Sequence, residues 1–140
     1  MNKTAYAYFS QVYRHEELFN ANLAALDELR DKALRVTRTF SSTPVQSSER
    51  RPMADSLDSL HDLEADILAD NERIMKTVRE VRAVIRSLED PDQRLVLEKR
   101  FLRSQSISQI AMDLGYSVSK VKKIYSDALD AAALPSFDRN

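Results

Sequence analysis

Serine and lysine side chains gather at residues 117–123, which read SVSKVKK. Lysine can donate hydrogen bonds to a guanine edge or to a phosphate oxygen, and serine can contact either group. A preceding group of three cations suits phosphate contacts. The chemistry that these side chains offer is recognition of a polyanion, and the candidate DNA-binding residues are Ser117, Ser119, Lys120, Lys122, Lys123, Lys99, Arg100 and Arg103.

The local charge favours this interpretation more than the charge of the whole chain does. The 140 residues carry a net charge of −1. Between Arg94 and Lys123, however, seven lysines and arginines are accompanied by only two acids, Glu98 and Asp113. A solvated helix face is the ordinary alternative, because charged residues on helices usually face water and do nothing more.

Catalysis is not predicted. A single glycine leaves no glycine-rich phosphate loop, and the chain has neither a cysteine nor an HExxH motif. His61, with Asp58 and Asp62 as helical neighbours, is more simply a surface histidine than a metal ligand. We therefore expect no enzyme activity, no cofactor and no metal. No apolar run could span a bilayer, and the lack of cysteine suits a reducing cytoplasm.

The position of the one glycine indicates how the basic stretch is presented. Gly115 follows Ala111 by four residues, the spacing at which a helix-turn-helix needs a small residue and then a turn with positive φ. Ser117 can cap the second helix. The positions that must be buried where the two helices cross are apolar, namely Ile110, Leu114, Tyr116, Val121 and Ile124.

Residues 89–134 are therefore predicted to form a domain of three short helices, near 91–103, 107–114 and 118–132. Pro91 can begin the first helix with Asp90 as its cap. Val118 and Val121 are expected to face inward, which leaves the lysines outside, near the end of the helix that would enter a major groove. A plain three-helix bundle is the alternative, and residues 135–140 are expected to be a tail.

Two long helices are predicted before this domain. Apolar residues recur every seven positions, as in a coiled-coil seam, at 5, 12, 19, 26, 33 and 40 and at 53, 60, 67, 74, 81 and 88. The polar segment 41–52 separates the columns and is the predicted linker of an antiparallel hairpin over residues 1–88. Asn22 then faces Asn71, and a hydrogen bond between them would fix the register; two partly exposed seam positions are the alternative.

Apolar residues also lie beside the seam, at Phe9, Leu23, Leu63, Leu68, Met75 and Val84. Two helices cannot cover all of them, so either two hairpins pair or the C-terminal domain packs on their flank. We expect a homodimer through the hairpin. The predicted fold class is all-α: a long antiparallel helical hairpin (coiled coil) followed by a three-helix helix-turn-helix domain.

The segment DPDQRLVLEKRFLRSQSISQIAMDLGYSVSKVKKIYSDAL, residues 90–129, resembles region four of bacterial sigma factors, the part that reads promoter DNA. The shared features are Leu97, Arg100, Phe101, Ile110, Ala111, Leu114, Gly115, Ser117, Val121, Ala128 and Leu129. The chain as a whole resembles small phage proteins that join a helical hairpin to such a domain. Some of these, of the ArpU and RinA type, regulate late-gene transcription.

The resemblance implies a sequence-specific transcription regulator, phage or prophage encoded, that binds double-stranded DNA as a dimer and contacts RNA polymerase. One alternative is a protein-interaction module without specific DNA readout, which the near-neutral charge and the exposed acids Asp127 and Asp130 favour. A small terminase subunit, which would form a ring, is the other alternative.

Overall fold

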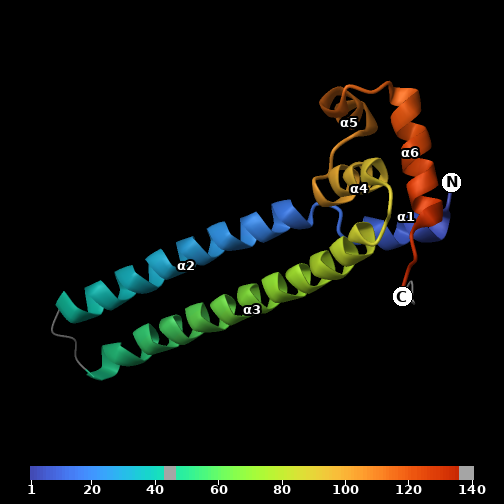
Figure 1. The fold of residues 1–140 in the computed structure, drawn as a ribbon. Coiled ribbons are helices and arrows are strands. Elements are labelled where there is room, and N and C mark those ends of the chain that lie inside the picture. Colours follow the sequence, from blue (N-terminus) through green and yellow to red (C-terminus); the bar gives the residue numbers. More distant parts are fainter. Residues whose placement is uncertain (43–46, 136–140) are drawn as a thin grey trace. The chain divides into compact units, whose positions relative to one another are not determined.

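The computed structural model describes the backbone of residues 1–42 and 47–135, and the side chains of residues 1–39 and 56–135. Every regular element in these ranges is a helix, which confirms the all-α prediction (Figure 1). The elements are α1 (Lys3–Ser10), α2 (His15–Ser42), α3 (Ser47–Arg86), α4 (Pro91–Leu97), the π-helix η1 (Glu98–Leu102), α5 (Ile107–Leu114) and α6 (Val118–Ala131).

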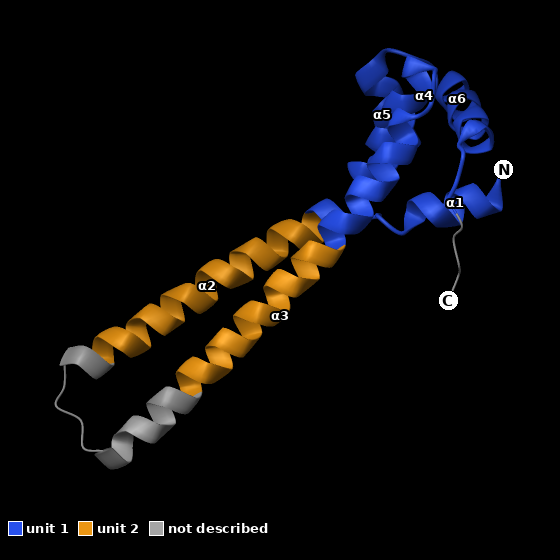
Figure 2. Ribbon diagram, turned by 60° about the horizontal axis from the view of Figure 1, so that its bottom comes forward, with its two compact units in different colours: residues 1–16, 74–140 blue, residues 17–73 orange. Residues whose placement is uncertain are grey.

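The chain divides into two compact units, each of which is described by itself (Figure 2). One consists of residues 17–73 and the other of residues 1–16 together with 74–140. This division differs from the predicted boundary at residue 88, because α1 and the end of α3 belong with the C-terminal helices.

The unit of residues 17–73 is an antiparallel helix pair formed by α2 and α3. The side-chain amide of Asn22 donates to Asn71 Oδ1 and to Asp70 Oδ2, each at 2.8 Å. Asn71 is buried and Asn22 is half-buried. Farther along α2, Arg30 pairs with Glu64 at 3.5 Å. The predicted contact between the two asparagines is therefore present, and the two residues face each other in the hairpin.

The connection of the hairpin is shorter than predicted. α2 ends at Ser42 and α3 begins at Ser47, so helix occupies part of the expected linker 41–52. Residues 40 and 53, the members of the two seven-residue columns nearest to it, lie outside the described side chains, as do residues 136–140 of the expected tail. Along the two helices several apolar side chains stay exposed: Leu18, Leu23, Leu34, Leu63 and Leu68.

The first helix is not continuous, contrary to the prediction from the column at residues 5–40. α1 ends at Ser10, and α2 begins only at His15. Arg14 has a left-handed backbone (φ 61°), and its N–H donates to Ser104 Oγ at 3.0 Å. The seven-residue pattern survives the break because Val12, within it, is still buried in the core.

The unit of residues 1–16 and 74–140 has a core to which α1, the end of α3, α4, η1 and α6 all contribute. Its buried members are Ala5, Tyr8, Phe9, Val12, Val81, Ile85, Leu88, Leu97, Phe101, Leu102, Ala128 and Leu129. Each large apolar side chain buried in it stabilises the fold by about 1.5–3 kcal/mol. Phe9 belongs to this core and Val84 packs against it, whereas Leu23, Leu63 and Leu68 remain exposed. The flanking apolar residues are thus covered by the C-terminal helices only in part.

The asparagine pair makes a testable prediction about the hairpin. Changing Asn22 alone to leucine leaves Asn71 buried without this donor, and should cost about 1–3 kcal/mol of stability. Changing both to leucine should instead raise the melting temperature while loosening register or oligomeric state. Thermal unfolding by circular dichroism and light scattering measure the two effects. A double variant with the wild-type melting temperature and one unchanged species would contradict the prediction.

Candidate nucleic-acid interface

The turn between α5 and α6 is built around Gly115. Its φ of 69° is left-handed, as predicted for the one glycine of the chain. The N–H of Tyr116 donates to the carbonyl oxygen of Ala111 at 3.0 Å, and that of Gly115 to Met112 at 3.4 Å. These two bonds form a Schellman motif, which satisfies the last carbonyl groups of α5.

Both helices of this motif begin with a serine cap. Ser106 Oγ accepts from the Gln109 N–H, and Ser117 Oγ accepts from the Lys120 N–H, each at 3.1 Å. α5 and α6 pack together, and a core of Val96, Ile110, Ala111 and Val121 lies between them and α4. With α4 beginning at Pro91 behind an Asp90 cap, the helices form a helix-turn-helix domain.

The N-terminal half of α6 presents a polar, cationic face. Ser119, Lys122 and Lys123 are exposed, and their spacing of three and four residues places them on one side of the helix. Val118, predicted to face inward, is 41% exposed. It is the first residue of α6, so no earlier turn of that helix covers it. An apolar side chain therefore lies beside the lysines at the start of the exposed face.

Lys120 is held against an aromatic ring. Its Nζ lies 3.8 Å from the ring centroid of Tyr116, a cation–π contact between residues four apart. The Tyr116 hydroxyl donates to the Asp92 carboxylate at 3.2 Å, and the charge of that carboxylate raises the pKa of Tyr116. The sequence predicts Tyr116 only as a buried apolar position, although its spacing of four residues from Lys120 also indicates this contact.

Two of the predicted phosphate-binding cations form ion pairs within the protein. Lys99 Nζ lies 3.7 Å from Asp113 Oδ2, and Arg103 donates to Glu16 Oε1 at 2.8 Å. Arg103 and Glu16 are about half exposed. Such a surface pair contributes about 0–1 kcal/mol, so exchange of Glu16 for a phosphate group costs little.

Arg100 is engaged in contacts within the protein. Its guanidinium donates to the carbonyl oxygen of Gln105 at 3.1 Å and lies 5.0 Å from the ring centroid of Tyr13. Burial raises the pKa of the neighbouring Tyr125, and the charge of Arg100 opposes that rise. Arg100 therefore joins η1 to the segment between α1 and α2 and lies near Tyr125 of α6. The predicted cations are thus divided between ion pairs and this internal contact.

Metal-ligating groups do not cluster in the part of the chain that the structure describes: no three or more histidine or acidic side chains come together there. His61 is exposed, and His15 lies with its Nδ1 at 3.5 Å from the Tyr13 carbonyl oxygen. Among the described residues, no helix has the length and apolar character that crossing a membrane requires.

The helix-turn-helix domain coincides with a match to a known family. Residues 87–131 match the family model of sigma-70, region 4. The C-terminal part of the chain is thus sigma region 4-like, as its sequence indicated, while α1, α2 and α3 lie outside the match. No curated protein and no solved structure is significantly similar to the chain.

The conformation of Gly115 predicts a backbone cost for any other residue. A Cβ at this position would meet no atom within 4 Å, so Gly115→Ala should destabilise only through its positive φ, by about 1 kcal/mol. Gly115→Asn should cost less, because asparagine tolerates the left-handed region. Urea unfolding of the three proteins measures the difference. An alanine variant as stable as the wild type would contradict the role of the glycine.

Proposed function

We propose that the protein is a sequence-specific DNA-binding transcription regulator that places the N-terminal end of α6 in the major groove. The exposed face of Ser119, Lys122 and Lys123, on the second helix of a sigma region 4-like motif, is the observation that carries the proposal. The N-terminal residues of such a helix are the ones that reach base edges.

Each side chain of α6 has a role in this proposal that follows from its surroundings. Lys122 and Lys123 donate to guanine edges or phosphate oxygens, and Ser119 contacts either group. Val118 contacts a thymine methyl group, which the exposed apolar side chain suits. Lys120 stays above the Tyr116 ring and faces a phosphate, while Ser117 holds the helix start through its cap.

The remaining cations divide between contact and support. Lys99 and Arg103 exchange their acidic partners for phosphate groups. The Arg103–Glu16 pair is a half-exposed surface pair, and the Lys99–Asp113 pair is long, at 3.7 Å. Arg100 supports the fold through Gln105 and Tyr13.

The proposal includes a homodimer formed through the hairpin. Leu23, Leu34, Leu63 and Leu68 are each 43–50% exposed on α2 and α3, and pairing of two hairpins would remove them from water. Two helix-turn-helix units then require a near-palindromic site with half-sites one or more helical turns apart. Phage or prophage origin and a contact with RNA polymerase, which the ArpU and RinA resemblance implies, belong to the same proposal.

Selection from a random duplex DNA pool at about 0.15 M salt tests the DNA contact. The wild type should enrich a palindromic motif, and Lys122→Ala with Lys123→Ala should weaken binding to it at least about tenfold. Removal of the same charge from exposed hairpin positions, by Lys32→Ala with Lys76→Ala, should leave binding nearly unchanged. The affinity of the wild type should also fall steeply with salt.

A folded, helical wild type that enriches no motif would contradict DNA readout and favour the protein-interaction alternative. If both double variants, Lys122→Ala with Lys123→Ala and Lys32→Ala with Lys76→Ala, lost DNA affinity equally, DNA binding would depend only on the overall charge.

Light scattering tests the dimer. The wild type should have twice the chain mass of 16.0 kDa, and Leu23→Glu with Leu68→Glu should halve it. Met112→Glu, at a 77% exposed position on α5, is the matched control and should leave the mass unchanged. A monomeric wild type would contradict the dimer, and a larger ring would favour the terminase alternative.

A further inference from the structure

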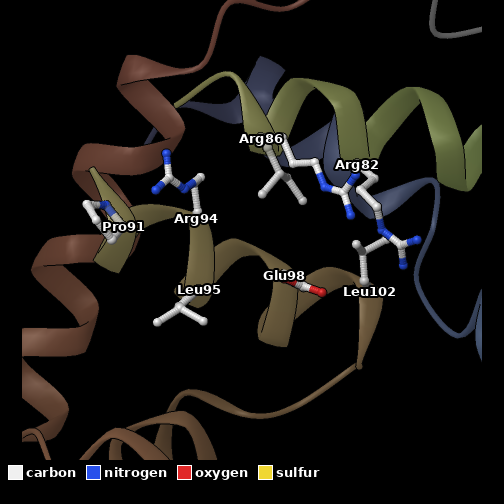
Figure 3. A pocket seen from close by; sticks show the side chains of 8 residues that line it. Arg82, Arg86, Pro91, Arg94, Leu95, Glu98 and Leu102 are labelled. Atoms are coloured by element: carbon white, nitrogen blue, oxygen red, sulfur yellow. The ribbon is translucent and has the colours of Figure 1, made fainter. Parts of the chain in front are cut away.

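A cleft of about 320 Å³ opens between the C-terminal end of α3 and the segment formed by α4 and η1 (Figure 3). Its apolar lining comes from Ile85 on α3, Pro91 and Leu95 on α4, and Leu102 on η1. Ile85 and Leu102 are buried members of the core, whereas Leu95 is 42% exposed. The residues that follow Leu95, Val96 and Leu97, are fully buried, so Leu95 is an exposed apolar side chain on an otherwise well-covered helix.

Three arginines surround this apolar lining: Arg82, Arg86 and Arg94. Arg94 already uses part of its hydrogen-bonding capacity within the protein, because its guanidinium donates to the Leu88 carbonyl oxygen at 2.7 Å. Neither Arg82 nor Arg86 forms an ion pair with any described residue, and Arg82 Nε is buried with no hydrogen-bond partner among them. Glu98 is the one acid of the lining, which leaves an excess of two positive charges.

The chemistry of this lining selects among anionic ligands. The planar guanidinium group of arginine donates two parallel hydrogen bonds to a carboxylate or a phosphate. A nucleic-acid backbone, however, offers no apolar group to cover Leu95, Pro91 and Ile85. A peptide with leucine or phenylalanine between aspartate or glutamate residues offers both, with its apolar side chains on the floor and its carboxylates at the arginines.

We propose that this cleft docks an acidic, amphipathic segment of a partner protein. The cleft is lined by residues of α3, α4 and η1, and by none of α6. It is therefore separate from the residues proposed to read DNA, and a partner can bind here with α6 still available. The proposal does not depend on DNA binding, because the peptide is recognised by arginines that the DNA contact does not use.

Panning of a random-peptide display library on the full chain, at about 0.15 M salt and without DNA, tests the proposal. The enriched peptides should combine two or more acidic residues with leucine, isoleucine or phenylalanine. Fluorescence anisotropy with the synthesised peptides should then show affinity losses of about tenfold or more for Arg86→Gln and for Leu95→Gln. Both positions are exposed, so neither change should impair folding.

Arg79→Gln is the matched control, since Arg79 is an exposed arginine on the same helix, two turns before Arg86 and outside the cleft. This variant should bind the peptides like the wild type. The proposal is overturned if no peptide is enriched, if the peptides are neutral or basic, or if Arg86→Gln binds them as tightly as Arg79→Gln does. Competition with random duplex DNA gives a further test. If the DNA displaces the peptide from the wild type but not from the variant with Lys122→Ala and Lys123→Ala, the two ligands share one surface, and the proposal is overturned as well.

Discussion

The helix-turn-helix domain depends on the contacts of the Phe101 ring. It is fully buried in η1 and stacks on Phe9 at 5.4 Å and on Tyr125 at 6.0 Å between ring centroids. Tyr6 and Tyr13 meet it edge-on at 6.1 and 6.2 Å. One side chain thus joins the N-terminal segment to η1 and α6. Because Tyr125 holds the buried face of α6 against Phe101, the lysines of α6 can remain on its exposed face.

The π-helical turn is what brings Phe101 and Leu102 into the core together. The N–H of Arg103 donates to the carbonyl oxygen of Glu98 at 3.1 Å, five residues back, so the turn is wider than in an α-helix. Two adjacent side chains can then lie on the side of Leu97, and all three are buried. The chain leaves this turn through Ser104, whose φ of 55° aims its hydroxyl at the N–H of Arg14. The wide turn and the break in the first helix are therefore parts of one arrangement.

The sequence could predict what depends on local or periodic signals. Gly115 and Ser117 act within a few residues, and the seven-residue columns fix which side chains face each other, as the contact between Asn22 and Asn71 shows. The break at residues 11–14 could not be predicted, because its partner Ser104 is 90 positions away. The same holds for Arg103, whose acidic partner Glu16 lies in the first turn of α2, directly after that break. The candidate cations were identified by type, but which of them remain available depends on contacts between distant segments.

The packing of α1 against α6 has a consequence for the newly made chain. Asn2 donates to the carbonyl oxygen of Leu129 at 3.5 Å, across 127 positions, so α1 is synthesised long before its partners in α6. At a synthesis rate of about 5–20 residues per second, Tyr8 and Phe9 wait several seconds for α6. The hairpin of residues 17–73, with its contacts inside one contiguous segment, can close during that interval. Helix α1 therefore meets α6 only after both arms of the hairpin have been synthesised, although α1 itself was synthesised before either arm.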